Sequence, residues 1–228
     1  AWLGRLALLH GNLGEVVQPF ANSIILSASG AVITLALAAA IAVSARRSKA
    51  ISKLSLYGAA MGYAAPGAVI AMGALAILGM AREAGWIGGL SSGLALAALF
   101  WAYAARFAAA GVQPIDAGLA RLSNGLDASA RTLGAGPWRR LLAVDLPIAG
   151  PSLAAAALIL FVEILKELPA TLILRPFDFD TLAVTAYSYA SDERLLQAAA
   201  PALLIFLAGL APIIILTRGI ARARAGQA

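Results

Sequence analysis

The sequence has 228 residues, of which 61% are hydrophobic and only 12% are charged. Soluble domains carry about a quarter charged residues, so this composition excludes an ordinary soluble protein and indicates one embedded in a lipid bilayer. The net charge of +6 does not indicate a nucleic-acid binder, because the basic residues lie in loops between apolar runs. Without cysteine, the chain has no disulfide and no thiolate site.

Five runs are long enough to cross a hydrocarbon core about 30 Å thick, which requires roughly 20 helical residues. They cover residues 16–45, 54–81, 84–105, 146–162 with a continuation to 174, and 195–217. The expected fold class is therefore an all-α membrane protein, a polytopic bundle of about five transmembrane helices.

The runs also predict the organisation of the chain. Residues 1–20 are expected to be an outer or interfacial lead-in, and residues 21–217 a transmembrane domain. Within that domain, the charged segment 112–150 is expected to be a cytoplasmic loop. Residues 218–228 form a basic cytoplasmic tail.

Charge alternates between the loops and predicts the topology. Basic residues concentrate in loops on one side, and acidic residues are more frequent on the other. The basic set is Arg46, Arg47, Lys49, Lys53, Arg106, Arg121, Arg131, Arg139, Arg140, Arg218, Arg222 and Arg224. By the positive-inside rule these loops are cytoplasmic, so the N-terminus is predicted to be periplasmic and the C-terminus cytoplasmic.

The second run contains Pro66 and Gly67 near its middle. Proline inside a helix removes a backbone hydrogen bond, so this pair is a candidate hinge, or else an ordinary kink in a packed bundle. Gly58, Gly62 and Gly73 in the same run, like Gly67, are expected to allow close helix packing.

The segment 112–150 combines charge with helical periodicity. Leucine and alanine recur at three- and four-residue spacing over 119–133 and predict an amphipathic helix. Gly134 and Gly136 can adopt the left-handed geometry that ends a helix, and Pro137 is expected to begin a second short helix that ends at Leu146-Pro147. The predicted shape is a protruding helical knob that a soluble partner could contact.

This segment resembles the cytoplasmic EAA loop of permease subunits in type I ABC importers. The matching stretch is 127–147 (DASARTLGAGPWRRLLAVDLP), and the spacing from its first glycine to the final Leu-Pro is intact. The family's glutamate is replaced by Ala128. The candidate coupling residues are Asp127, Ala128, Ser129, Ala130, Gly134, Leu146 and Pro147. The alternative is a loop that only returns the chain to the membrane.

The resemblance implies that residues 124–140 form a coupling helix that sits in a groove of a separate ATP-binding cassette ATPase subunit. The chain contains no GxxxxGK[ST] motif, so ATP is expected on that partner and no cofactor on this chain. We therefore expect a transport subunit without ATPase activity of its own.

Three further stretches are similar to the C-terminal half of ferric iron permeases, and the resemblance covers roughly residues 20–220. They are 103–107 (YAARF), 161–171 (FVEILKELPAT) and 174–183 (LRPFDFDTLA). The family implies a multi-pass protein of the bacterial inner membrane that receives ferric iron from a periplasmic iron-binding protein. Because such permeases usually carry two halves in one polypeptide, a second permease half is expected, as the same or a different chain. Membrane lipid is the remaining partner, and no nucleic acid is expected.

Glu163, Lys166 and Glu167 are the candidate pathway residues. Charges in a membrane helix are costly, and their spacing of three and four residues predicts one shared helical face. Their carboxylates would suit ferric iron, or the group is an internal Glu-Lys pair that fixes helix packing around Pro169.

Acidic residues also follow Arg175 in an outer loop. Asp178, Asp180, Asp192 and Glu193 are expected to contact the binding protein rather than to hold metal, and no metal site is predicted with confidence. His10 has no partner at metal-ligand spacing.

Two alternatives remain open, namely another substrate and a different class of transporter. The same architecture could serve another substrate, such as thiamine, a polyamine, sulfate or molybdate. A secondary transporter or channel would need inverted repeats or an embedded ion site, neither of which is convincing here. An intramembrane enzyme is disfavoured, because the chain has one histidine and no cysteine.

Overall fold

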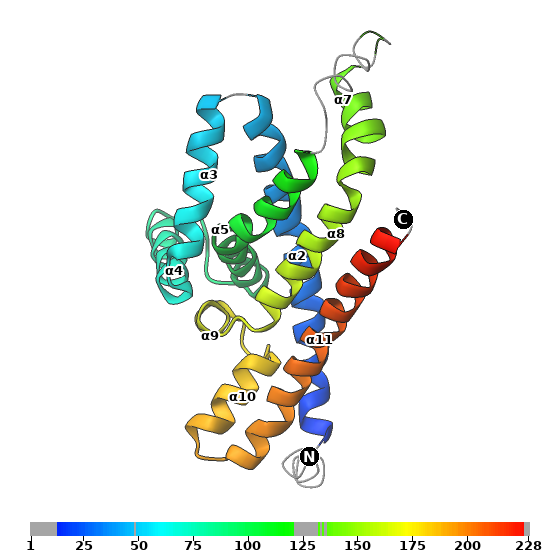
Figure 1. The fold of residues 1–228 in the computed structure, drawn as a ribbon. Helices are drawn as coiled ribbons and strands as arrows, with labels where there is room; N and C mark the ends of the chain where they lie inside the picture. The colour runs from blue at the N-terminus through cyan, green and yellow to red at the C-terminus, as the bar shows by residue number, and fades with distance from the viewer. Residues whose placement is uncertain (1–12, 48, 121–131, 133, 135, 226–228) are drawn as a thin grey trace.

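The computed structural model describes residues 13–47, 49–120, 132, 134 and 136–225, and these residues form helices without any strand. The helices in chain order are α2 (Leu13–Arg47), α3 (Lys49–Ala64), α4 (Gly67–Glu83), α5 (Ser92–Leu119), α7 (Pro137–Arg140), the π-helix η1 (Leu141–Asp145), α8 (Leu146–Leu165), α9 (Pro169–Leu174), α10 (Leu182–Ser191) and α11 (Leu195–Ala225). The predicted all-α bundle is confirmed (Figure 1).

Four of these helices are long and apolar enough to cross a membrane, and α3 with α4 makes a fifth if the bent pair is one span. The helices α2, α5 and α8 pack most extensively against one another. Figure 1 shows α7 at one end of the molecule and the start of α2 with the turn from α10 to α11 at the other, and α11 runs from that turn toward the end with α7.

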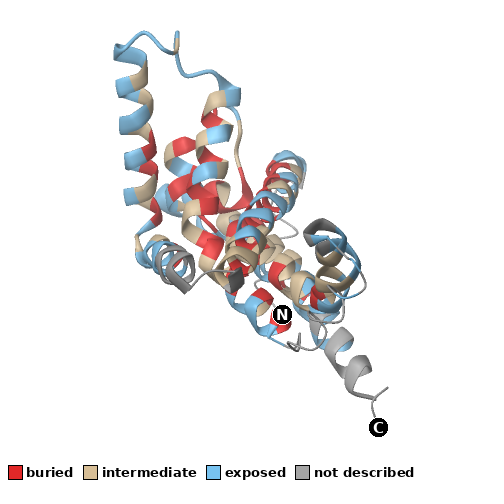
Figure 2. Cartoon of the chain, turned by 90° about the horizontal axis from the view of Figure 1, so that it is seen from above, coloured by how far each residue is buried: buried red, intermediate tan, exposed pale blue. Residues whose placement is uncertain are grey.

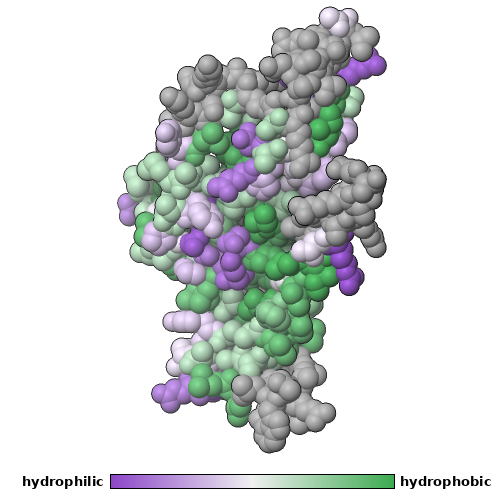
Figure 3. Space-filling model, viewed as in Figure 1, coloured by the Kyte–Doolittle hydropathy of each residue, from purple (hydrophilic) through white to green (hydrophobic). Residues whose placement is uncertain are grey.

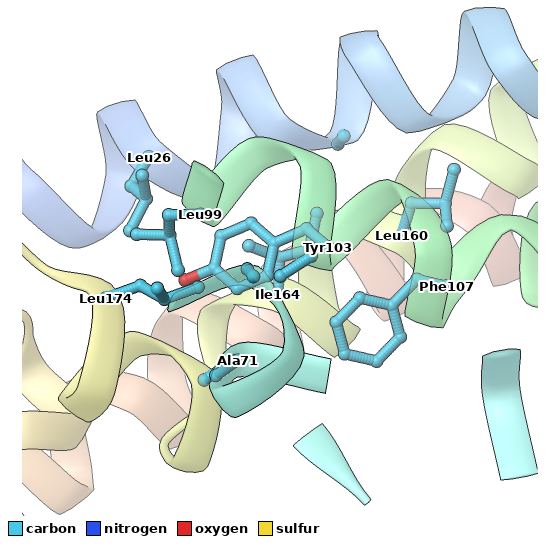
Figure 4. Close-up of a cluster of buried hydrophobic side chains, with 12 residues drawn as sticks. Leu26, Ala71, Leu99, Tyr103, Phe107, Leu160, Ile164 and Leu174 are labelled. Atoms are coloured by element: carbon cyan, nitrogen blue, oxygen red, sulfur yellow. The ribbon is translucent and has the colours of Figure 1, made fainter. Parts of the chain in front are cut away.

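The core lies where these central helices meet, and Figure 2 shows buried residues gathered in the middle of the bundle. One apolar cluster surrounds Tyr103 and contains Leu26, Leu99, Ile164 and Leu174 (Figure 4). The face seen in Figure 3 has an extended hydrophobic area over α10 and α11, as contact with a bilayer requires, and a hydrophilic patch at mid-height.

The third span differs from the prediction of residues 84–105. Gly85 adopts a φ of +74°, and α5 begins only at Ser92, where the Ser91 side chain accepts the amide hydrogen of Leu94. The helix then continues through Arg106 to Leu119. Arg106 therefore lies inside a span, and the sequence-based assignment of this residue to a cytoplasmic loop was wrong.

The second and fourth spans are both broken. The axis bends by 106° between residues 56–64 and α4, with Pro66 at the break. In the fourth span, α8 ends at Leu165 and a separate helix, α9, begins at Pro169. The predicted continuation to residue 174 is therefore not one straight helix, because each proline lacks the amide hydrogen that would extend the preceding helix.

The segment 112–150 contains less loop than the sequence indicated. Residues 112–119 complete α5, and residues 146–150 begin α8. Pro137 begins a short helix, as predicted, but that helix does not end at Leu146-Pro147, because it runs through η1 directly into α8. Most of the predicted amphipathic helix over 119–133 lies outside the described residues. At the other end of the chain, residues 13–20 of the predicted lead-in belong to α2.

Small residues allow the helices to approach closely, as the glycine content indicated. A Cβ added at Gly62 would overlap the carbonyl oxygen of Ala105 on α5, and one added at Gly111 would lie 2.9 Å from Cβ of Ala38 on α2. By contrast, Gly58 and Gly73 have no neighbouring atoms within 4 Å of such a Cβ. Only part of the glycine series in the second run therefore serves helix packing.

Candidate functional site

Glu167 lies at the centre of the bundle, in the break between α8 and α9. Its side chain is only 5% exposed, and its Oε2 lies 3.7 Å from Nε of Arg106. An isolated charge inside a membrane helix costs at least about 2.5 kcal/mol, so each of these buried groups requires the other. Glu167 is therefore neutralised by a cation from a different helix.

Arg106 reaches this position from the middle of α5. Its side chain is 24% exposed, and its guanidinium carbon lies 5.4 Å from the ring centroid of Phe107. The Nη1 atom is buried without a hydrogen-bond partner among the described residues. The ion pair thus joins α5 to the break after α8.

The break in the second span meets the same ion pair. A Cβ added at Gly67 would overlap Nη1 of Arg106 and lie 2.5 Å from Oε1 of Glu167. Only glycine leaves room there for both charged groups. The predicted hinge and one of the predicted pathway residues therefore lie side by side, although they are 100 residues apart in the sequence. We call Gly67, Arg106, Glu167 and Ala170 the central junction.

Glu167 also organises the start of α9. Its Oε1 accepts the amide hydrogen of Ala170 at 3.0 Å, and its carbonyl oxygen accepts the hydroxyl hydrogen of Thr171 at 2.7 Å. The Thr171 hydroxyl has one hydrogen, so the Tyr103 hydroxyl, 2.6 Å away, donates to Thr171. This buried chain of hydrogen bonds fixes α9 against α5.

Glu163 and Lys166 form a separate ion pair at 2.8 Å, in which the side chains are 22% and 56% exposed. Lys166 is the C-terminal cap of α8, and Glu167 lies beyond the helix end. The three residues therefore do not share one continuous helical face, contrary to the sequence-based expectation. Glu163 and Lys166 lie toward solvent or lipid, whereas Glu167 turns inward.

The coupling segment is described only in part. Asp127, Ala128, Ser129 and Ala130 lie outside the described residues. Gly134 has a φ of +74°, the left-handed geometry that the sequence predicted. The last pair of the motif, Leu146 and Pro147, forms the first turn of α8.

The acidic loop that follows Arg175 is held by an ion pair at its start and by a hydrogen bond from α2. Asp180 pairs with Arg175 at 2.7 Å, and its carbonyl oxygen accepts a hydrogen bond from the Asn22 side chain. Among the described residues, no group of three or more His, Asp or Glu side chains could hold a metal ion. His10 lies outside that part of the chain.

Sequence reasoning missed Arg106, Tyr103 and Thr171 as members of one arrangement. The available signal was the apolar periodicity beyond Arg106, where Phe107, Val112 and Ile115 are buried along α5. A single arginine in such a pattern marks a paired charge inside a span rather than the end of the span.

The helices of this chain are arranged as in solved membrane transporters. The chain is similar to a solved structure described as a bacterial ABC transporter involved in the import of the acidic polysaccharide alginate, with a TM-score of 0.72. The match covers 90% of this chain and 79% of the other at 15% sequence identity, so it concerns the fold. The chain has the fold of an ABC importer permease.

Sequence relatives refine this class. The chain is 27% identical over 211 residues to the Fe(3+)-transport system permease protein FbpB 2 of Haemophilus influenzae, a match that covers 91% of this chain and 40% of the relative. It is 34% identical over 86 residues to the putative 2-aminoethylphosphonate transport system permease protein PhnV of Salmonella typhimurium. That match covers 38% of this chain and 32% of the relative. No family model matches the sequence. The chain thus spans less than half the length of these relatives, and it resembles ABC transporter permeases, a ferric iron permease among them.

Proposed function

We propose that this chain is a permease subunit of an ABC importer that forms half of a translocation path for ferric iron. A periplasmic binding protein would deliver the iron, and a separate ATPase subunit would drive the change between inward-open and outward-open states. The observation that carries the proposal is the match to a ferric iron permease over 91% of the chain. The relative that transports 2-aminoethylphosphonate by name matches over only 38%.

The arrangement of the ends supports the proposed topology. The coupling segment leads into α7 at one end of the molecule, and the turn between α10 and α11 lies at the opposite end, from which α11 runs toward the end with α7 (Figure 1). A protein with a cytoplasmic C-terminus would then present α7 to an ATPase in the cytoplasm and Asp192 and Glu193 to a binding protein in the periplasm. A second permease half would complete the path.

Reconstituted transport tests this proposal. The chain is placed in liposomes with the proposed partner half and ATPase subunit, and the proposed binding protein is supplied loaded with ferric iron, molybdate or 2-aminoethylphosphonate. We expect ATP-dependent uptake of iron alone. ATP-dependent uptake of another substrate would contradict iron but retain the importer, whereas uptake without the ATPase would refute the importer as well.

The ion-paired Glu167 is a poor ligand for a passing cation, which leaves Glu163 as the candidate pathway carboxylate. Its pair with Lys166 is partly exposed, so the carboxylate is accessible for exchange. If this face guides ferric iron, Glu163→Gln lowers iron uptake and Glu163→Asp retains most of it. Equal uptake in both variants at equal membrane content would exclude the pathway role.

A further inference from the structure

The central junction joins segments that are otherwise separate in the bundle. Arg106 comes from α5, Glu167 from the break after α8, Gly67 from the first residue of α4, and Ala170 from the first turn of α9. The two bent spans therefore meet at one ion pair. No other ion pair between different helices occurs so deep in the described part of the chain.

The two short helices that follow the breaks also pack on each other. Ala71 and Ala74 of α4 share one apolar cluster with Ala170 and Leu174 of α9. The helix α4 is turned by 106° from the preceding segment, so it is not a straight continuation of α3. The contacts of α4 with α9, together with the junction, therefore make these two helices one packed unit.

The ion pair ties this unit to α5, because Arg106 belongs to α5 and Glu167 to the break that precedes α9. Separating Arg106 from Glu167 would leave two uncompensated charges in a low-dielectric interior, whereas sliding one apolar helix along another costs little. A change of access state that preserves the pair is therefore favoured over one that breaks it. The pair restricts which segments move relative to each other.

We propose that the Arg106–Glu167 pair, seated under Gly67, makes Arg106, Glu167 and Gly67 positioning residues for transport. The pair ties the start of α9 to α5, against which α4 also packs, so that α4 and α9 move as one body when the access state changes. This inference rests on the proposed permease function. It adds that the two breaks act together rather than as independent hinges. It also assigns a role to Arg106, which the pathway proposal did not use.

Distances between spin labels test this coupling without disturbing the ion pair. Since the chain has no cysteine, single cysteines can be introduced at exposed sites without background. The pair Met72→Cys on α4 and Leu172→Cys on α9 reports on the unit, and Met72→Cys with Phe206→Cys on α11 reports on its motion against the bundle. In complexes with one labelled chain, we expect ATP to change the distance between α4 and α11 and to leave the distance between α4 and α9 constant. A distance between α4 and α9 that changes with ATP would overturn the proposal.

A matched pair of glycine variants tests the role of the ion pair. Gly67→Ala adds a methyl group that must displace the ends of two flexible side chains, whereas Gly73→Ala, on the same helix, meets nothing within 4 Å. We expect Gly67→Ala to broaden the distribution of α4–α9 distances and to lower substrate uptake per ATP hydrolysed about tenfold, which lies within the usual range for coupled sites. Gly73→Ala should match the unmodified chain in both measurements.

The outcomes separate this inference from the proposed function. If Gly67→Ala only reduces the amount of folded protein, while the distances and the uptake per molecule stay unchanged, the residues are merely structural and the proposal is wrong. If the unmodified complex transports nothing and its distances ignore ATP, the permease function fails. The distance distributions of Gly67→Ala and Gly73→Ala still decide whether the junction holds α4 to α9. Glu167→Gln, which keeps an acceptor for the Ala170 amide, repeats the test if Gly67→Ala does not fold.

Discussion

Tyr103 and Thr171 are placed inside this bundle so that each hydroxyl hydrogen has an acceptor. Tyr103 is fully buried among leucine and isoleucine side chains (Figure 4), yet its hydroxyl donates to Thr171, which in turn donates to the carbonyl oxygen of Glu167. In a membrane, an unsatisfied buried donor would cost several kcal/mol. The chain therefore uses these residues to orient α9 rather than to contact water.

Removal of one hydroxyl tests this role. Tyr103→Phe deletes the 2.6 Å hydrogen bond to Thr171 while the ring stays in place, so we expect a loss of about 1 kcal/mol in the free energy of unfolding. Tyr57→Phe, at an exposed position on α3, is the matched control. Thermal unfolding of the purified variants measures the difference. Equal midpoints for the two variants would show that the buried hydroxyl contributes nothing.

Tyr189, on α10 and outside the candidate spans, provides a prediction on pH. Its hydroxyl donates to Oε2 of Glu15 at 2.8 Å, and this hydrogen bond, with smaller effects of burial and of the Glu15 charge, raises the pKa of Tyr189 above its ordinary value of 10.0, against the opposing effect of Arg194. Because the folded-state pKa is raised, the contact stabilises the folded chain below about pH 10 and is lost as the pH rises through the folded-state pKa.

Tyrosinate absorbance measures this shift. The difference between the unmodified chain and Tyr189→Phe isolates the titration of Tyr189, and we expect a midpoint above 10. Glu15→Gln removes the carboxylate charge and should lower that midpoint. An identical midpoint with and without the Glu15 charge would contradict the assigned cause.

At the scale of helices, the close contact of α3 with α5 depends on a single glycine. A Cβ at Gly62 would overlap the carbonyl oxygen of Ala105, which is backbone and cannot rotate away as a side chain can. Gly62→Ala should therefore destabilise the protein by about 1–3 kcal/mol. Gly58→Ala, one turn earlier on α3, meets no atom within 4 Å and should be neutral or slightly stabilising. Chemical unfolding compares the two, and a Gly62→Ala variant as stable as Gly58→Ala would show that the helices separate without cost.

The all-helical class and the approximate number of spans could be predicted, because length and hydropathy are local properties of the sequence. The breaks were predictable only in part. Pro66 was singled out as a candidate hinge, but the 106° bend depends on the way α4 packs against α5 and α9. The boundary of α5 was misplaced because Arg106 was counted as a loop charge, and its partner Glu167 is 61 residues away in the sequence. Pairings at that separation follow from tertiary packing, which no single-sequence pattern contains.

The same limit applies to the site. Glu167 was singled out because a carboxylate in an apolar run must be paired, hydrated or near the interface. The sequence grouped it with Glu163 and Lys166 on one helical face, whereas the structure pairs it with Arg106. A spacing of three or four residues brings side chains together only within one helix. Because α8 ends at Leu165, Glu167 lies beyond the helix and does not share a face with Glu163.

For the molecule as a whole, the proposed coupling to an ATPase depends on the segment that precedes α7. Gly134 has a φ of +74°, whereas Gly136, two residues later, has no such geometry, and neither has an atom within 4 Å of an added Cβ. An alanine in left-handed geometry costs about 1–2 kcal/mol, so Gly134→Ala changes the backbone here while Gly136→Ala does not.

If this turn presents a coupling helix, Gly134→Ala lowers the yield of ATPase that co-purifies with the permease and lowers ATP-dependent uptake in proportion. Gly136→Ala retains both. Retention of co-purification and uptake by Gly134→Ala would mean that the ATPase contacts another surface, since the strain acts on this turn alone.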